Sequence, residues 1–213
     1  MRLKQLLLLL PLLLVAALPA KADQDYVWVN GSYSTVSNGY GIGPYGGTLT
    51  SGSTVTPTQF FCVDFNDQIS GNTGWSANVT SLTSSSSSFN QTRQGNQTFY
   101  LEAAWLINKM LNPKNTQALD IQLQWAIWYL SLGKTDTSFF DYASDVSWDQ
   151  QALNAVDSGN LGFSPVGWQI LTPIGGYGQE FIVPGPGAAT PEPRTIVLLL
   201  AGLAAFLVLG RKK

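Results

Sequence analysis

An apolar segment lies at each end of the chain, and these two segments confine any folded domain to the middle of the sequence. Leu6 to Leu18 forms one apolar run, and Ile196 to Leu209 contains only apolar residues and glycine. Between them, Asp23 to about Thr190 is long enough to bury the hydrophobic core of one domain. We therefore expect one folded domain and no second one.

The N-terminal segment is typical of a secretory signal peptide. Arg2 and Lys4 give it a positive start, the apolar run follows, and Ala20-Lys21-Ala22 supplies a small-residue cleavage pattern. An uncleaved membrane anchor is the alternative, but the Ala-x-Ala ending and the polar sequence after it favour removal. Residues 1–22 are predicted to be removed and the remainder to be exported.

The C-terminal apolar run predicts a transmembrane helix and basic tail over residues 195–213. At ~1.5 Å per residue the run is slightly short for a bilayer core of ~30 Å, so the flanking basic side chains have to reach outward to the interface. Because basic clusters stay on the cytoplasmic side, the rest of the chain is expected to face outward. A Pro/Gly-rich linker, 185–194, joins this helix to a domain predicted at 23–184.

The tail also carries a sequence motif. Pro191, Glu192 and Pro193 are followed by the short apolar helix and then by Arg211, Lys212 and Lys213. This order resembles the PEP-CTERM sorting signal, found on exported proteins of Gram-negative, often biofilm-forming bacteria. The resemblance implies that an exosortase, a membrane cysteine protease, removes the helix, so that a membrane-anchored precursor becomes a protein of the cell surface or extracellular matrix. An ordinary tail anchor would explain the helix and the basic tail but not the tripeptide.

Composition excludes several function classes. Charged residues make up 11% of the chain and the net charge is −2, so the basic footprint of a nucleic-acid-binding protein is absent. The sequence contains no histidine, which removes Ser-His-Asp and Cys-His catalysis and every histidine-based zinc site. We expect no enzyme activity, no catalytic residue, no metal and no cofactor.

The first part of the predicted domain has the pattern of short strands. Residues 26–58 alternate in brief bursts broken by glycine and proline, and Gln59 to Phe65 is rich in aromatics. Residues 167–173 and 178–185 are expected to form a last strand pair. Ser81 to Ser88 is a low-complexity stretch for which a solvated loop is expected.

Two helices are predicted between these strands. Apolar residues at helical spacing begin at Phe99 and end before Asn112-Pro113, and a second helix is expected from Gln117 to Leu132. The fold class is therefore α+β, a β-rich sandwich or barrel-like domain with an inserted pair of helices at about 98–132.

The second predicted helix is apolar on most of its surface. Its polar residues form one narrow stripe of Gln117, Asp120, Gln124 and Ser131. Periodicity alone favours a thin solvated edge for this stripe. The alternative is that it faces a small internal pocket in which an amide side chain is held close to a partner.

The chain has a single cysteine, Cys62, within the stretch QFFCVDFND. It lies far from the signal peptide, which excludes a lipid anchor, and no histidine is present to activate it as a catalytic nucleophile. A buried small hydrophobe and an intermolecular disulfide remain open from the residues alone.

A further interpretation comes from two short motifs in a fixed order. Phe61-Cys62-Val63-Asp64 together with Leu123-Gln124-Trp125-Ala126-Ile127-Trp128 resembles the signature pair of bacterial surface thioester domains, over about Gln59 to Leu132. In that family a strand cysteine and a helix glutamine are joined through the sulfur and the side-chain carbonyl. The resemblance implies a thioester between Cys62 and Gln124, and covalent attachment to an amine of a surface protein or matrix component.

Such a bond needs a dry site, because water competes with the amine for the activated carbonyl. We expect aromatic neighbours to form the wall of a pocket around it. The predicted wall consists of Phe60, Phe61, Asp64, Trp125 and Trp128.

Other constellations are less specific. Asp64, Asn66 and Asp67 lack the glycine and distal glutamate of a calcium loop. Asp64, Glu102 and Asp120 would serve as glycosidase carboxylates only if the fold brought two of them together. The leading hypothesis is an exported covalent adhesion module. The alternative is a non-covalent structural matrix or biofilm protein in which Cys62 is a packed free thiol.

Overall fold

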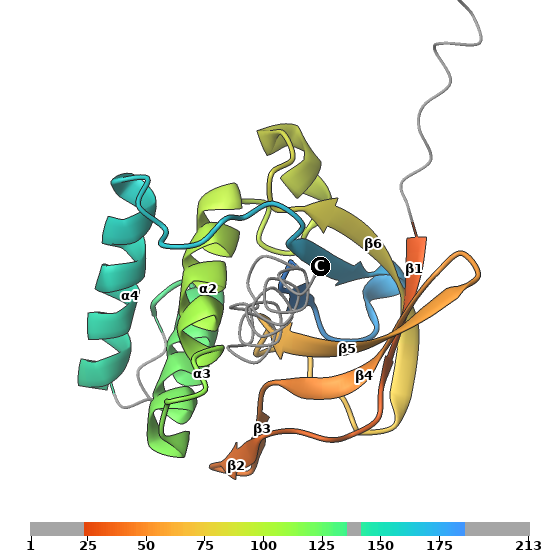
Figure 1. Ribbon diagram of the computed structural model, residues 1–213, viewed down its shortest axis with the longest axis horizontal. Helices are drawn as coiled ribbons and strands as arrows, with labels where there is room; N and C mark the ends of the chain where they lie inside the picture. The colour runs from red at the N-terminus through yellow and green to blue at the C-terminus, as the bar shows by residue number, and fades with distance from the viewer. Residues whose placement is uncertain (1–23, 136–141, 186–213) are drawn as a thin grey trace, which may run out of the picture.

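The computed structural model describes residues 24–135 and 142–185, and its centre is a closed antiparallel barrel. The strand order is β1-β4-β5-β8-β7-β6, and pairing of β1 with β6 closes the ring. The predicted α+β class is confirmed, with a barrel as its β part (Figure 1). The barrel strands are β1 (Gln24–Val29), β4 (Tyr45–Ser51), β5 (Thr54–Cys62), β6 (Thr73–Ser81), β7 (Gln169–Pro173) and β8 (Phe181–Val183).

Strand β1 shows how the sequence fits a barrel, because its side chains alternate between the barrel interior and the exterior. In β1 every second residue is buried, and Val27 and Val29 point into the barrel. The β4–β5 hairpin turns at Gly52, whose φ of 58° lies in the left-handed region that favours glycine. The predicted last strand pair is also present, since β7 and β8 pair antiparallel.

A small hairpin leaves the barrel between β1 and β4. It consists of β2 (Thr35–Ser37) and β3 (Tyr40–Ile42). Ser37 Oγ accepts a hydrogen bond of 3.0 Å from Trp125 Nε1, which fastens the hairpin to a helix. A short 3-10 turn, η2 (Ile174–Gly176), lies in the connection between β7 and β8.

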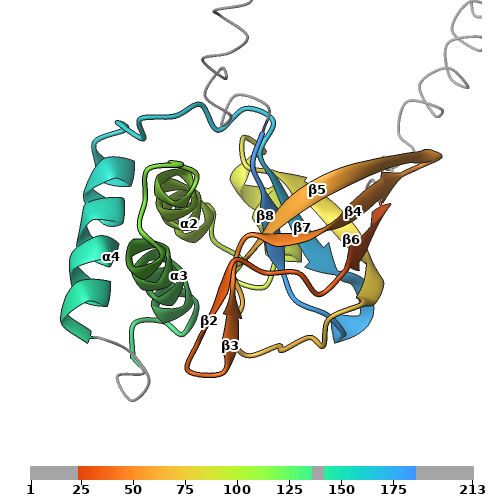
Figure 2. The same cartoon turned by 60° about the horizontal axis from the view of Figure 1, so that its bottom comes forward.

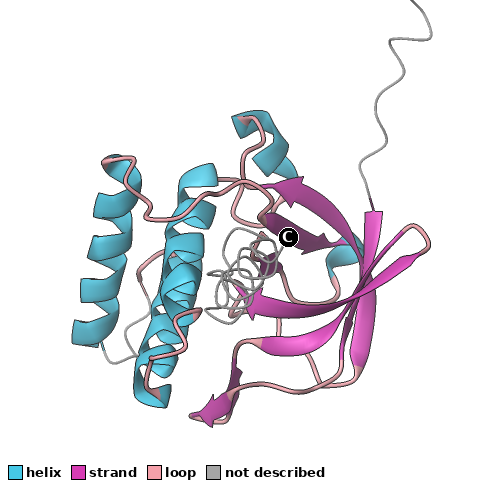
Figure 3. Ribbon diagram, in the orientation of Figure 1, coloured by secondary structure: helices cyan, strands magenta, loops and turns pink. Residues whose placement is uncertain are grey.

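The helices α2, α3 and α4 lie between β6 and β7 in the sequence and on one side of the barrel in space (Figure 3). α2 and α3 pack against each other and α4 packs against both of them, on the side away from the barrel (Figure 2). Asn96 and Thr116 cap the two predicted helices by accepting backbone N–H groups. The elements are η1 (Ser86–Gln91), α2 (Gln97–Met110), α3 (Gln117–Ser131) and α4 (Tyr142–Asp157).

The expectation of a helical pair at about 98–132 is therefore incomplete, because the described insertion holds a third long helix, α4. The buried face of α4 includes Asp145 and Asp149 beside Ala152. Carboxylates occupy positions that apolar residues usually fill, so apolar periodicity does not reveal this helix. The expected solvated loop at Ser81 to Ser88 is also only partly correct, since Leu82 is buried and η1 begins at Ser86.

The hydrophobic core has two clusters that meet along β5 and α3. Phe61 and Ile127 belong to the cluster under the helices, whereas Cys62 and Trp128 belong to the cluster inside the barrel. Neighbouring residues of one strand point to opposite faces, which divides Phe61 from Cys62. The end of β5 and the middle of α3 thus lie where the two layers join.

The predicted signal peptide, the sorting motif and the C-terminal helix fall outside the described residues. Within residues 24–135 and 142–185, no helix has both the length and the apolar character needed to cross a membrane.

Candidate functional site

The two residues of the predicted thioester meet at the junction of barrel and helices. Cys62 is the last residue of β5 and Gln124 lies in α3, and neither has any exposed surface. Gln124 Nε2 donates a hydrogen bond of 2.9 Å to the backbone carbonyl oxygen of Cys62. The fold thus brings these positions into direct contact although they are far apart in the sequence.

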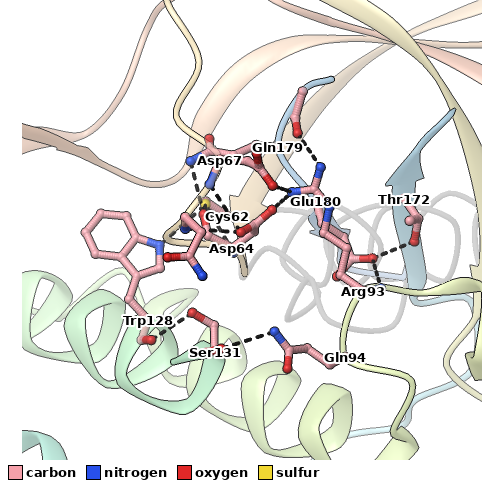
Figure 4. A network of polar contacts seen from close by, with 12 residues as sticks. Cys62, Asp64, Asp67, Arg93, Gln94, Trp128, Ser131, Thr172, Gln179 and Glu180 are labelled. Carbon is pink, nitrogen blue, oxygen red and sulfur yellow. Dashed lines mark hydrogen bonds and ion pairs between the residues drawn. The ribbon is translucent and has the colours of Figure 1, made fainter. Parts of the chain in front are cut away.

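The Cys62 sulfur has hydrogen-bonding groups around it. The indole N–H of Trp128 and the backbone N–H of Asp64 each donate to Sγ over 3.4 Å, and the thiol donates to the Asp64 carbonyl oxygen over 3.1 Å (Figure 4). Burial raises the pKa of the Cys62 thiol to about 12, against the lowering effect of the Trp128 hydrogen bond. A free thiol here stays protonated at neutral pH, while the two donors favour any thiolate that forms.

The side-chain carbonyl of Gln124 differs from most buried polar groups. Its Oε1 is buried and accepts no hydrogen bond from the described part of the chain. Gly43 leaves room beside it, because a side-chain carbon built on that glycine would lie 3.2 Å from Oε1. The carbonyl oxygen is therefore an acceptor whose capacity is unused.

Aromatic rings surround this contact. Trp128 lies with its ring centroid 5.0 Å from that of Trp125 and 5.3 Å from that of Phe65, and the Tyr40 centroid lies 6.0 Å away from it. Trp125 and Trp128 belong to the predicted wall, whereas Tyr40 and Phe65 do not. Tyr40 comes from the β2–β3 hairpin, and no sequence signal links that hairpin to α3.

The two phenylalanines predicted for the wall are both fully buried, but they lie on opposite faces of β5. Phe60 shares the barrel-interior cluster with Cys62 and packs against Phe181, with centroids 5.5 Å apart. Phe61 belongs to the cluster under the helices. Phe60 is therefore on the same side of the strand as the sulfur, and Phe61 is not.

Asp64, the remaining predicted wall residue, contributes its backbone to the sulfur and its carboxylate to an ion pair with Arg93. Arg93 Nη1 also lies 2.5 Å from Asp67 Oδ2, and Nη2 donates to the Gly178 carbonyl oxygen over 2.7 Å. Gln179 Nε2 donates to the Asp64 carbonyl oxygen over 3.2 Å. These contacts hold the turn after Cys62 against the segment that leads into β8.

Glu180 belongs to the same network of contacts around Arg93 and is completely buried. Its carboxylate accepts hydrogen bonds from Thr172 Oγ1 and Tyr100 OH, both at 2.5 Å, and from the Arg93 backbone N–H at 3.1 Å. Burial raises the pKa of this carboxyl, although the three donors work in the opposite direction. Sequence reasoning misses Arg93, Tyr100 and Glu180, because they meet across about 80 residues without a local motif.

A pocket of about 220 Å³ opens beside the site. Trp128 connects the two, since it lines the pocket and donates to the Cys62 sulfur. The pocket-lining residues include no charged side chain, so a guest would meet rings, glycine backbone and amide groups. The larger lining side chains are Tyr33, Tyr40, Tyr45, Phe65, Gln68, Trp128 and Gln179.

The polar stripe of α3 divides into two parts. Gln117 is exposed and bonds the Thr35 side chain, as a solvated edge predicts. Gln124 and Ser131 are buried, so the solvated-edge prediction is wrong for them. The half of the stripe that enters the junction with the barrel is the half that carries the candidate chemistry.

The weaker carboxylate constellation is not assembled. Asp64 pairs with Arg93, Glu102 with Lys134, and Asp120 Oδ1 accepts from Asn115. Within the residues that the structure describes, no group of three or more potential metal-ligating side chains lies together.

Comparisons with known proteins give one likeness in three dimensions. No protein-family model matches the chain, and no curated protein matches it. Its fold is similar to "The N-terminal domain of the Streptococcus pyogenes pilus tip adhesin Cpa", with 12% sequence identity and a TM-score of 0.45. The similarity covers 79% of this chain and 96% of that one. A likeness this loose establishes no function for this chain.

Proposed function

We propose that this protein is a covalent attachment module that stores an internal thioester between Cys62 and Gln124. The observation that carries the proposal is the fully buried contact between the two residues, in which Gln124 Nε2 lies 2.9 Å from the Cys62 carbonyl oxygen. The resemblance of the two flanking motifs to surface thioester domains supports it independently of the structure.

The bond would form by attack of the Cys62 sulfur on the Gln124 side-chain carbonyl carbon. The new bond joins Sγ to that carbon, the carbon–nitrogen bond breaks, and the nitrogen leaves as ammonia with the thiol proton. The contact holds the reacting groups close together, which lowers the entropic part of the barrier. The surrounding rings and complete burial keep water away from the product.

In the second step a primary amine attacks the same carbonyl carbon. An amide forms, the carbon–sulfur bond breaks, and the thiolate takes up a proton from the amine nitrogen. The N–H groups of Trp128 and Asp64 would stabilise the departing sulfur. The module is consumed by its own reaction, so this is a single-turnover device and not an enzyme with turnover.

The pocket beside Trp128 gives the amine a place to approach. Aromatic faces attract alkylammonium groups, and an uncharged pocket favours their neutral, nucleophilic form. The partner in this proposal is an amine-bearing surface protein or matrix component.

The intact mass of the full chain tests the proposal, once N-terminal sequencing has fixed where the protein begins. The parent should be lighter than its calculated mass by one ammonia and should gain one methylamine on treatment with that amine. The Cys62→Ala and Gln124→Ala variants should show neither change. Gln122→Ala is the matched control, because Gln122 lies on the same helix two residues away and should leave both changes intact.

A parent at its full calculated mass, with a thiol that titrates after unfolding, would remove the covalent function. The protein would then be the alternative, a non-covalent matrix protein with a packed cysteine.

We also propose that the chain is exported, held in the membrane by its C-terminal helix, and released to the cell surface or matrix by an exosortase. The motif at Pro191, Glu192 and Pro193 and the tail Arg211, Lys212 and Lys213 support this. Replacing Glu192 with alanine in an exosortase-bearing host should leave the protein in the membrane fraction. Equal release of parent and variant would contradict this assignment.

A further inference from the structure

The side of the barrel away from the helices carries two exposed aromatic residues that the attachment chemistry does not use. Tyr26 is 43% exposed and Trp28 is 37% exposed. Both belong to β1, and residues two apart in a strand point to the same side. Figure 1 shows β1 at the edge of the molecule opposite the helices.

Gly74 on β6 determines how the two rings lie. It pairs directly with Trp28, and a side-chain carbon built on it would lie 2.6 Å from the Tyr26 hydroxyl and 2.9 Å from Trp28 Cε3. Both rings therefore extend over the glycine and lie along the sheet. We call this surface, Tyr26 and Trp28 over Gly74, the aromatic platform.

Hydroxyl groups flank the aromatic platform on both neighbouring strands. Thr48 and Thr50 on β4 pair with Trp28 and Tyr26, and Ser76 on β6 pairs with Tyr26 from the other side. Directly paired residues share a face of the sheet, so these hydroxyls stand beside the rings.

The strands that carry the aromatic platform and its flanks are almost free of charge. Strands β1, β4, β5 and β6 together contain one charged residue, Asp25, and it is only 6% exposed. Soluble proteins carry about 25% charged residues, so the charge-free outer face is unusual. It offers no ionic contact to a nucleic acid or to an anionic lipid headgroup.

We propose that the aromatic platform binds a neutral polysaccharide. The C–H face of a sugar ring stacks on an aromatic ring, while its hydroxyls need donors and acceptors and not charges. Tyr26 and Trp28 meet over Gly74 and so offer one continuous aromatic surface on which a sugar ring can stack. This site is independent of Cys62 and Gln124, and it would place the module on a glycan without consuming the thioester.

Affinity electrophoresis of the full chain tests the proposal, in native gels with a detergent that has no sugar headgroup. Soluble hydroxyethyl cellulose and mannan are the neutral probes, and alginate is the anionic one. Retardation by at least one neutral glycan is expected. Tyr26→Ala and Trp28→Ala should each weaken it by about fivefold, as expected for the loss of one stacked ring.

Two control variants show whether retardation depends on the aromatic platform alone. Tyr177→Ala removes an aromatic that is 86% exposed outside the platform and should leave retardation unchanged. Cys62→Ala should also be retarded like the parent, whether or not the thioester forms. The proposal is overturned by no retardation in either neutral glycan, by retardation that survives both platform variants, or by binding only to alginate or to phosphatidylglycerol vesicles.

Discussion

Two clusters of polar side chains in this molecule differ in charge. Around Cys62 and Gln124 the contacts are mostly between neutral groups, and the Gln124 carbonyl oxygen has no partner in the described chain. In the helical layer, Lys134 Nζ lies 2.8 Å from Asp149 Oδ2 and 3.7 Å from Glu102 Oε2, so charges compensate each other. The second group holds two carboxylates against a cation, as expected of a contact that stabilises the fold, whereas the first holds a neutral amide against a thiol, as expected of a site arranged for chemistry.

The largest expected effect comes from removing the charge that compensates the helical group. Lys134→Met leaves Glu102 and Asp149 close together and nearly buried. Breaking such a group should lower the free energy of unfolding by about 2 kcal/mol, below the range for a fully buried pair because Lys134 is 40% exposed.

Urea unfolding measures this loss, with Lys114→Met as the control, since Lys114 is exposed. The yield of methylamine adduct should not change in either variant. A loss of stability no larger than that of the control would contradict the structural role given to Lys134.

Trp128→Phe tests the donor at the sulfur while keeping an aromatic ring in place. Without the indole N–H, the departing thiolate loses one of its two donors. The rate of methylamine incorporation should fall about tenfold, equivalent to about 1.4 kcal/mol in the barrier. Trp105→Phe is the control, because Trp105 packs in the helical cluster. Equal rates for parent and Trp128→Phe would show that this donor is not used.

Glu180→Gln tests how the buried carboxyl near the Cys62 sulfur makes the free energy of unfolding depend on pH. Because burial raises its pKa above the reference of 4.5, Glu180 adds stability below that pH and loses this contribution as pH rises through the higher, folded-state pKa. The free energy of unfolding of the parent should therefore fall more than that of the variant as pH rises from 4.5 to neutrality. Glu102 is present in both proteins, so the difference isolates Glu180. Parallel curves would contradict the prediction.

Gln124→Leu should have the smallest effect on stability and a complete effect on chemistry. The substitution removes a buried acceptor without a partner in the described chain, together with one hydrogen bond to Cys62. In a Cys62→Ala background, where no crosslink can form, these opposing contributions should leave the free energy of unfolding within about 1 kcal/mol of that of Cys62→Ala alone. In the chain that keeps Cys62, methylamine incorporation disappears. A loss above about 2 kcal/mol, on the scale of Lys134→Met, would mean that Gln124 is mainly structural.

The sequence predicts the local parts of this site better than its long-range parts. The motifs around Cys62 and Gln124 place both residues on the correct elements, and α3 ends one residue from its predicted boundary. Arg93, Tyr100 and Glu180 carry no such motif, since their positions depend on how η1, α2 and β8 come together. α4 escapes prediction for a related reason, because its inner face carries the buried carboxylates Asp145 and Asp149, and the ion pair of Asp149 is with Lys134 from another segment.

The pairing of β5 bears on whether two copies of this protein can associate through a strand edge. From Thr54 to Phe60 the strand pairs with β4 alone, since its register with β8 covers Phe61 and Cys62. An unpaired strand edge of this kind is a template on which a strand of a neighbouring molecule can pair and start a fibril. Pro57 lies in its middle and offers no N–H for the ladder that a foreign strand would need. Pro57 pairs with Thr48 of β4 and interrupts the hydrogen-bond ladder that association through this edge of β5 would need.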